Sequence, residues 1–319
     1  MKSISELIDY YYKELYPVLE ELDNDRKALK SRVLTVGMIY TIIVSVIVFS
    51  LLGYMNIELI IFTLVAYVVL GGLIYKFMIS DYRNEFKSKI IKPLIQEIDH
   101  TFRYIPDLHI GVENFKRSGL FPHPDRFSGN DLVKGKVDGV DLTFSDFHAE
   151  KEHRDSKGRR SYSTVFKGLF IISDFHKNFS GKTVVLPDLA QSTFGDFIGS
   201  FLQSNNFSRN GDLIKMDSPD FEKEFVVYGT DQVEARYILT HTLMEKILDY
   251  KKHSGHPVYV SFRGKNIFMA IEYNKDLFEP SVFRSLLEYK IAMEYIKTLH
   301  LSIGIVEELK LNQKLWNQV

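Results

Sequence analysis

The sequence predicts an α+β protein that begins with a two-span transmembrane helical hairpin on a helical stalk and continues into a domain of mainly antiparallel strands and helices. Three observations predict it: two uncharged apolar runs, apolar residues at helical spacing on either side of them, and short β-type runs from about Pro106. We divide the chain into an amphipathic helix (1–32), the membrane hairpin (33–79), a stalk helix (80–105) and a cytosolic α+β domain (106–319).

The first apolar run, Leu34–Tyr54, has 21 residues without a charge. In a helix it covers roughly 31 Å, close to the hydrocarbon thickness of a bilayer. The second run, Leu59–Tyr75, has 17 residues and reaches Ile79 if the Lys76 amine extends to the interface. Only Met55–Glu58 connects the runs, which predicts a tight hairpin rather than a signal peptide. The alternative is a pair of buried core helices.

Basic residues flank the two runs, whereas the connection between the runs has none. Because Lys and Arg are retained on the cytoplasmic side, we expect both termini to lie in the cytoplasm. The flanking residues are Arg26, Lys27, Lys30 and Arg32 before the first run, and Lys76, Arg83, Lys87, Lys89 and Lys92 after the second.

Small residues recur within both runs, at Gly37, Thr41 and Ser45 in the first and at Gly71 and Gly72 in the second. Such positions let two helices approach closely, which favours packing within the hairpin and leaves docking on other spans, including a second copy, as the alternative. Neither run contains an ionisable Asp, Glu, Lys, Arg or His, so the spans are expected to anchor the protein rather than conduct ions.

Amphipathic patterns on both sides of the hairpin predict an antiparallel helical stalk, with Pro93 kinking or breaking its second helix. The acidic content of residues 1–25 disfavours the alternative, a helix lying flat on lipid headgroups. The apolar positions are Ile4, Leu7, Ile8, Tyr11, Leu15, Val18, Leu19 and Leu22, followed by Phe86, Ile90, Leu94 and Ile98.

Strand patterns dominate the remaining chain. Asp138-Gly139 predicts a tight turn between strands 131–137 and 140–147. Further strands are expected at 161–173, 182–186 and 223–228, and a second hairpin at 258–262 and 267–273. An apolar stripe at Phe194, Phe197, Ile198, Phe201 and Leu202 predicts a helix that packs on the sheet, with a partner groove as the alternative.

Helices are expected from Asp231 and from Ser281. Asp231 and Glu234 have the spacing of a capping box, and the helix they begin should break near Thr240. The helix from Ser281 should run to about Leu299 and continue towards Trp316.

The segment Glu150–Arg160 concentrates five basic residues and three acidic residues around a glycine. This composition predicts a solvated hairpin tip; the alternative is a contact with anionic lipid or an acidic partner. The basic residues that would make that contact are Lys151, Arg154, Lys157, Arg159 and Arg160.

Composition excludes several classes of protein. Lys and Arg total 40 against 41 Asp and Glu, which argues against a nucleic-acid binder, and the absence of cysteine excludes disulfides, thiolate metal sites and thiol nucleophiles. We find no phosphate loop, nucleophile elbow or zinc-binding helix motif, and predict neither a cofactor nor a metal. His148 and His153 are disfavoured as metal ligands because their parity along a strand differs. Asp146, Asp174 and Glu272 remain as candidate acid–base carboxylates.

Several segments together resemble a bacterial family known as domain of unknown function 3137, over roughly residues 100–315. The most specific part is Asp231 to Thr240, although His241 stands where the family pattern has a proline. The resemblance implies a bacterial inner-membrane protein with a cytosolic domain. The family has no established activity, so the resemblance supplies no catalytic residue. The segments are SGLF (118–121), GNDLVKG (129–135), VFKGLFI (165–171), FVVYGTDQVEARYILTHTLMEKI (225–247) and VSFRGKNIFMAIEYNKDLFEP (260–280).

The function that these observations favour is a membrane-tethered cytosolic binding or scaffolding module, with a protein partner and with homo-oligomerisation left open. Two alternatives are an accessory subunit of a membrane complex and a hydrolase-type enzyme without a recognisable motif.

Overall fold

The structure is a computed structural model that describes residues 2–51, 53, 56–188, 203, 213–273 and 275–316. It divides into two compact units, each formed by segments distant in sequence. The helical unit comprises Ser5–Leu94 and Phe278–Glu294, and the sheet unit comprises Met1–Ile4, Ile95–Leu277 and Tyr295–Val319.

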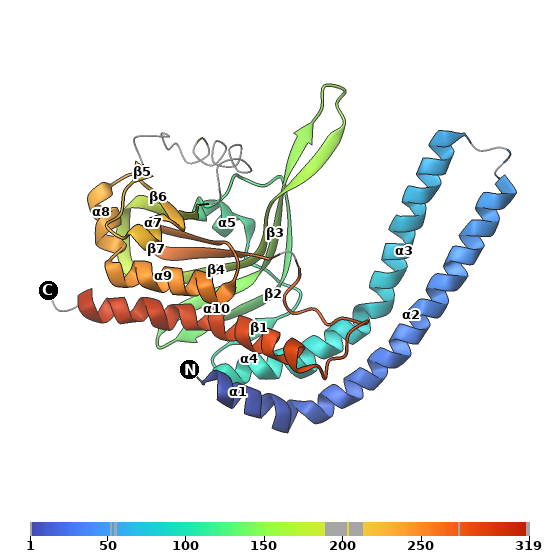
Figure 1. The fold of residues 1–319 in the computed structure, drawn as a ribbon, viewed down its shortest axis with the longest axis horizontal. Helices are drawn as coiled ribbons and strands as arrows, with labels where there is room; N and C mark the ends of the chain where they lie inside the picture. Colours follow the sequence, from blue (N-terminus) through green and yellow to red (C-terminus); the bar gives the residue numbers. More distant parts are fainter. Residues whose placement is uncertain are drawn as a thin grey trace. The chain divides into compact units, whose positions relative to one another are not determined.

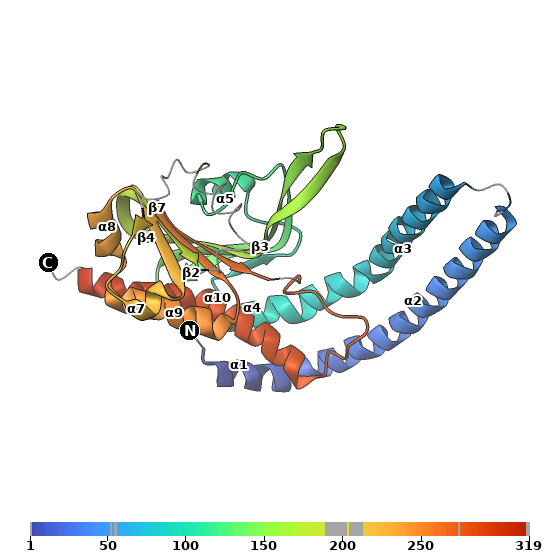
Figure 2. The ribbon, with the colours of Figure 1, turned by 45° about the horizontal axis from the view of Figure 1, so that its top comes forward.

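Two long helical segments form most of the helical unit and lie side by side (Figures 1 and 2). Outside the uncharged runs their apolar positions are buried, including Leu15, Leu19 and Leu22 on one segment and Phe86 and Ile90 on the other, as their spacing predicts. The first segment consists of α1 (Ile4–Tyr10), a π-helical turn (Tyr11–Leu15) and α2 (Tyr16–Leu51); the second consists of α3 (Ile57–Phe86), a π-helical turn (Lys87–Ile91) and α4 (Lys92–Ile98).

Each π-helical turn ends two residues before a proline, Pro17 in the first segment and Pro93 in the second. Proline has no N–H to donate to the preceding turn, and a wider turn is one way for a helix to absorb that loss. The expected irregularity at Pro93 is therefore a π-helical turn within a continuing helix rather than a break.

The segment Phe278–Glu294, which we call the strap, returns to the helical unit late in the sequence. Its first half is not helical, so the predicted helix start at Ser281 is wrong. The rest of that prediction, a helix through Leu299 towards Trp316, is confirmed by α10 (Tyr289–Trp316). The backbone amides of Phe283 and Arg284 bond to the Ser281 hydroxyl, and that of Leu286 bonds to a carboxylate of α2. These bonds take the amides that a helix would use.

A single antiparallel sheet forms the centre of the sheet unit, in the order β1-β2-β3-β4-β6-β5, with β7 along the other edge of β4. The strands are β1 (Arg103–Ile105), β2 (Arg126–Val137), β3 (Val140–Arg154), β4 (Arg160–Pro187), β5 (Leu213–Ile214), β6 (Phe225–Gly229) and β7 (Val258–Glu272). The helices are α5 (Val112–Ser118), α7 (Pro219–Glu222), α8 (Gln232–Ile238) and α9 (His241–Ser254).

The turn at Asp138-Gly139 is confirmed, with φ of 49° and 87° at the two residues and β2 paired to β3 on either side. The predicted second hairpin is wrong, because 258–262 and 267–272 belong to one strand, β7, which pairs with β4 from Val260 to Glu272. The strands expected at 161–173 and 182–186 are likewise one strand. Both strands are irregular at the same place, where the register shifts between Asp174 and Lys182 opposite Gly264.

Helices cover both faces of the sheet, α5 on one face and α9 on the other (Figures 1 and 2). Successive residues of the central strands are therefore all buried, as at Leu169, Phe170 and Ile171. Gly168 shows how closely β4 and β7 approach: its φ is 152°, and a Cβ there would lie 2.0 Å from the Ile271 carbonyl oxygen.

The predicted start and break of the helical region after β6 are confirmed. The Asp231 carboxylate accepts from the Val233 and Glu234 amides, and Thr240 caps α9 by accepting from Leu243. Glu234 does not complete a capping box with Asp231; its carboxylate accepts the Ser180 and Gly181 amides of β4 at 2.8 Å. The predicted stripe from Phe194 to Leu202 lies outside the described residues.

Candidate functional site

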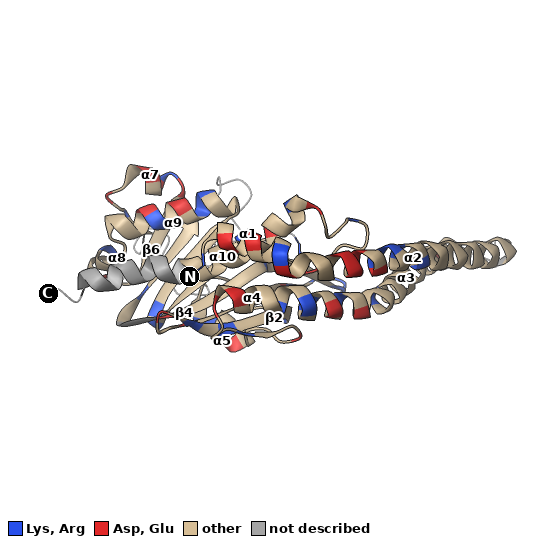
Figure 3. Ribbon diagram, turned by 90° about the horizontal axis from the view of Figure 1, so that it is seen from below, with Lys and Arg blue, Asp and Glu red and all other residues tan. Residues whose placement is uncertain are grey.

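The uncharged stretches of α2 and α3 expose their apolar side chains. Among the described residues between Leu34 and Phe77, 21 large apolar side chains are at least 37% exposed, and Phe77 reaches 85%. Each helix contains a stretch long and apolar enough to cross a membrane, and none of that stretch is buried. This exposure contradicts the alternative of buried core helices. Within the described residues, neither 34–51 on α2 nor 59–75 on α3 contains Lys, Arg, Asp or Glu, and in Figure 3 this part of the two helices is drawn in tan.

Tyrosines provide most of the specific contacts between α2 and α3 within this stretch. The rings of Tyr40 and Tyr67 stack with centroids 5.1 Å apart, and the Tyr40 hydroxyl donates to the Tyr67 carbonyl. Thr41 shares a 2.8 Å hydrogen bond with the Tyr67 hydroxyl, and a Cβ on Gly71 would lie 3.3 Å from the Tyr40 ring.

The other small residues of the predicted stripe are not covered by the partner helix of the hairpin. A Cβ added at Gly37 or Gly72 would meet nothing within 4 Å, and Ser45 is exposed. The structure thus places Thr41 and Gly71 at the helix–helix contact and leaves Gly37, Ser45 and Gly72 accessible.

The hairpin tip between β3 and β4 is exposed, and most of its cations already have a carboxylate partner. Lys151 pairs with Asp125, Arg154 and Arg160 with Glu152, and Arg159 with Asp155. Of the five predicted contact residues, Lys157 is the one for which the described residues provide no ion pair. The tip therefore presents matched charges rather than a cationic patch.

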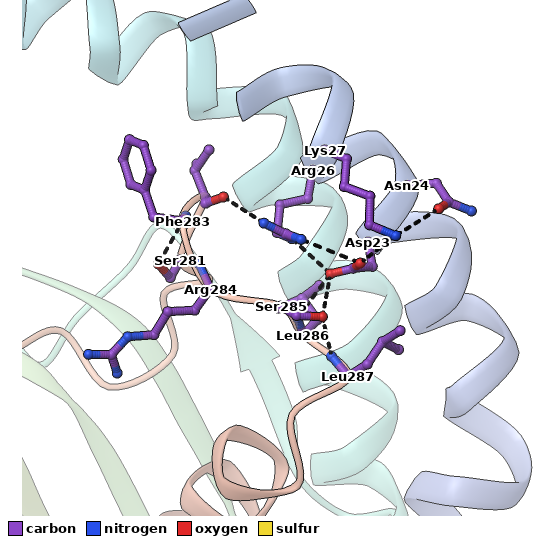
Figure 4. A network of polar contacts seen from close by, with 11 residues as sticks. Asp23, Asn24, Arg26, Lys27, Ser281, Phe283, Arg284, Ser285, Leu286 and Leu287 are labelled. Atoms are coloured by element: carbon purple, nitrogen blue, oxygen red, sulfur yellow. Dashed lines mark hydrogen bonds and ion pairs between the residues drawn. The ribbon is translucent and has the colours of Figure 1, made fainter. Parts of the chain in front are cut away.

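A buried polar network, which we call the clasp, joins α2 to the strap inside the helical unit (Figure 4). Asp23 is only 1% exposed, and its Oδ1 accepts from Arg26 Nε at 2.7 Å, Ser285 Oγ at 2.9 Å and the Leu286 amide at 3.1 Å. Arg26 Nη1 donates to the Val282 carbonyl at 2.9 Å. The clasp consists of Asp23, Arg26, Val282, Ser285 and Leu286.

Hydrogen bonds decide the charge state of Asp23. Burial by itself would raise the pKa of this carboxyl, but donation from Arg26, Ser285, Lys27 and the Leu286 amide outweighs it and holds the pKa well below its usual range. Asp23 is therefore ionised at neutral pH. A second pair in the same unit joins the strap to the π-helical turn after α3, where the Nζ of buried Lys87 lies 2.7 Å from Glu279 Oε1.

Sequence reasoning missed the clasp because it considered Asp23 only as part of the acidic content of residues 1–25. A signal was nevertheless present: Asp23 follows Leu19, and Arg26 follows Leu22, each at spacing four, so both continue the buried apolar stripe.

The sheet unit contains a groove of about 540 Å³ between α5, β4 and β7. Its described lining carries four cationic side chains and one carboxylate, over a floor that includes Phe121. The lining residues are Glu113, Asn114, Lys116, Arg117, Gly119, Phe121, His123, Lys182 and Arg263. We call this the basic groove.

Two of these cations lie directly opposite one another on adjacent strands, Lys182 on β4 and Arg263 on β7. Burial lowers the pKa of both side chains, and the charge of Arg263 lowers that of Lys182 further. Arg263 Nη1 donates to the Arg117 carbonyl at 3.0 Å, at the end of α5. The end of α5 is held in place by a 2.6 Å hydrogen bond from Ser261 Oγ to the Ser118 carbonyl.

The carboxylates considered as an acid–base set do not converge. Asp146 lies opposite Leu169, whereas Glu272 lies opposite Gly168, so their positions along the strands have opposite parity. Asp174 lies six residues along β4 from Gly168, which is about 20 Å at 3.3 Å per residue. Asp146 instead accepts the Leu277 amide at 2.9 Å, and Glu272 accepts from the Tyr259 hydroxyl at 3.1 Å.

The two histidines that were considered as metal ligands, His148 and His153, have hydrogen-bonding partners on the neighbouring strand. His148 and His153 lie within hydrogen-bonding distance of Thr164 and Ser163 on β4. Within the described part of the chain, no three His, Asp or Glu side chains are grouped so that they could hold a metal ion.

Comparison with known proteins supplies a family resemblance but no activity. Residues 164–311 match the model of a family described as protein of unknown function (DUF3137), which confirms the resemblance over a shorter range than expected. The matched range starts within β4 and leaves out α2, α3 and α5. No curated protein matches the sequence.

One solved structure is similar, the crystal structure of the mycobacterial trehalose monomycolate transport factor A, TtfA. The identity is 10% and the TM-score 0.34, over 67% of this chain and 92% of that chain. A likeness of this degree carries no argument about function.

Proposed function

We propose that this protein is a membrane-anchored binding or scaffolding module, in which α2 and α3 cross the bacterial inner membrane and hold the sheet unit in the cytoplasm. The observation that carries the proposal is the exposure of the 21 large apolar side chains between Leu34 and Phe77. Moving such side chains from water into lipid is worth about 2 kcal/mol each, so their sum amounts to tens of kcal/mol. A bilayer removes this surface from water.

Charge supports the orientation. Lys27, Lys30 and Arg32 precede the first apolar run and Lys76 follows the second, while the connection carries no basic residue. The Tyr40–Tyr67 stack and the Thr41–Tyr67 hydrogen bond satisfy the polar atoms between the helices, and the described spans present no charged side chain to lipid.

Alkaline carbonate extraction and reporter fusions test the anchor. We expect the full chain to stay with sedimented membranes after carbonate washing. Alkaline phosphatase inserted at Asn56 should be active, because that site is periplasmic, and the same enzyme fused after Val319 should be inactive. Release by carbonate contradicts the anchor, whereas an active fusion after Val319 contradicts only the orientation.

Gly37 and Gly72 favour a second candidate, an accessory subunit of a membrane complex, because both are open to another helix. The substitution Gly37→Leu meets no atom of this chain within 4 Å of the new Cβ and should leave the hairpin intact. If α2 docks on other spans, this variant should run as a smaller species on a native gel of detergent-solubilised membranes. Unchanged migration argues against the subunit.

A further inference from the structure

The basic groove has an excess of positive charge that its described surroundings do not neutralise. Lys116, Arg117, Lys182 and Arg263 face one lining carboxylate, Glu113, which is exposed and pairs with Lys116 at 3.0 Å. Arg117 donates to the neutral side chain of Asn114 and lies over the Phe268 ring. No carboxylate among the described residues forms an ion pair with Lys182 or Arg263.

The cross-strand pair of Lys182 and Arg263 is the most informative part of the groove. Directly opposed like charges destabilise an antiparallel sheet, and partial burial makes the repulsion harder for water to screen. The structure nevertheless places both side chains at one cavity, beside the irregular part of β4 and β7. An anion between them would turn a repulsive pair into two attractive contacts.

A purely structural role accounts for only part of Arg263. One of its N–H groups holds the Arg117 carbonyl at the end of α5, which fixes the side chain beside the groove. A guanidinium has five N–H donors, so most of its hydrogen-bonding capacity remains for a ligand. The side chain of Lys182 contributes a point charge with three N–H donors. Its main-chain N–H donates separately to the Thr230 hydroxyl.

We propose that the basic groove binds a phosphate-bearing anion, held chiefly by Lys182 and Arg263. Several cations around one carboxylate suit a multiply charged group better than a single carboxylate ligand, and guanidinium groups match the geometry of phosphate oxygens. The volume of about 540 Å³ leaves room for an organic portion over Phe121. The inference names the ligand class of the proposed binding module and in that sense rests on it, but it does not depend on the membrane anchor.

Titration calorimetry on the full chain in a non-ionic detergent tests the inference with two probes, inorganic pyrophosphate and the soluble short-chain lipid dihexanoyl phosphatidylglycerol. The variants are Lys182→Met and Arg263→Gln, which remove one charge each while keeping similar size. Lys223→Met is the matched control, because Lys223 is an exposed cation paired with Asp220 and does not line the groove. Thermal melting of each variant reports whether it is folded.

We expect at least one probe to bind, with affinity that falls as salt is added and drops tenfold or more in both groove variants but not in Lys223→Met. Binding of pyrophosphate identifies a free anion as the source, and binding of the lipid alone identifies a headgroup. If neither probe binds, or if the control loses as much affinity as the groove variants, the inference is wrong. A chain that resists carbonate extraction yet binds neither probe overturns this inference and leaves the membrane anchor standing.

Discussion

The clasp and the basic groove are clusters of charge shielded from full solvent exposure, and their charges are balanced in opposite ways. In the clasp, the Asp23 carboxylate is matched by Arg26 and by donors from Ser285 and Leu286, so its charge is neutralised within the protein. In the basic groove, Lys182 and Arg263 repel each other and the described lining offers one carboxylate, Glu113. A cluster whose charges are paired within the protein stabilises the fold, whereas a cluster with unpaired like charges indicates a binding site for a ligand of opposite charge.

The largest expected effect is at the clasp. Asp23→Ala leaves the buried Arg26 without its carboxylate and should lower the free energy of opening the strap by about 3–5 kcal/mol. Hydrogen–deuterium exchange at the Leu286 amide measures this opening, because that amide donates to Asp23. Glu20→Ala, an exposed acid on the same helix, is the control and should leave the exchange rate unchanged. Equal exchange in both variants would show that the clasp does not hold the strap.

A smaller loss is expected when both charges of the clasp are removed. The double variant Asp23→Leu with Arg26→Met leaves no buried charge in the clasp, so its cost should be about 1–2 kcal/mol, for the Ser285 and Leu286 donors that lose their acceptor. The same exchange measurement applies. A double variant that opens more readily than Asp23→Ala would contradict the view that the unpaired arginine dominates the cost.

A still smaller effect is expected from acid. Because the pKa of Asp23 lies below its unfolded value of about 4, the stability it provides is present above pH 4 and is lost as the pH falls towards the folded pKa. Exchange at Leu286, corrected for its intrinsic pH dependence, should start to rise between pH 4 and pH 3. In Asp23→Asn this rise should be absent; if it persists, another acid is responsible.

The smallest effect is expected at the groove and has the opposite sign. Lys182→Met relieves the repulsion with Arg263, so without ligand the sheet unit should be unchanged or more stable by about 0.2–1 kcal/mol. Thermal melting of the full chain measures it, with Lys223→Met as the control. A melting temperature clearly lower than that of the control would show that Lys182 stabilises the fold.

Local patterns predicted the elements whose stabilising contacts are close in sequence. The turn at Asp138-Gly139, the cap at Asp231 and the break at Thr240 are all fixed within a few residues, and each is confirmed. Elements that depend on distant contacts were missed. The Glu234 carboxylate accepts amides of β4 instead of completing a capping box with Asp231. The strand β7 continues through Gly264 because it pairs with β4 on both sides of that residue.

The groove could not be predicted for the same reason. Lys116 and Arg263 are far apart in the sequence, and the loop-like composition of the Arg263-Gly264-Lys265 stretch favoured a hairpin turn. Only the register of β4 with β7 brings Lys182 opposite Arg263, and the end of α5 is held beside them by bonds from Arg263 and Ser261 of β7 to the Arg117 and Ser118 carbonyls.

The sequence by itself determined the apolar helical pair, because a run of 21 uncharged residues is helical and unsuited to water whatever surrounds it. It also determined the antiparallel, hairpin-rich character of the rest. The tertiary structure decided where the charges lie: that Asp23 is buried with partners from the strap, and that Lys182 meets Arg263 at a cavity. Charge pairing depends on distances between residues far apart in the chain, and only folding sets those distances.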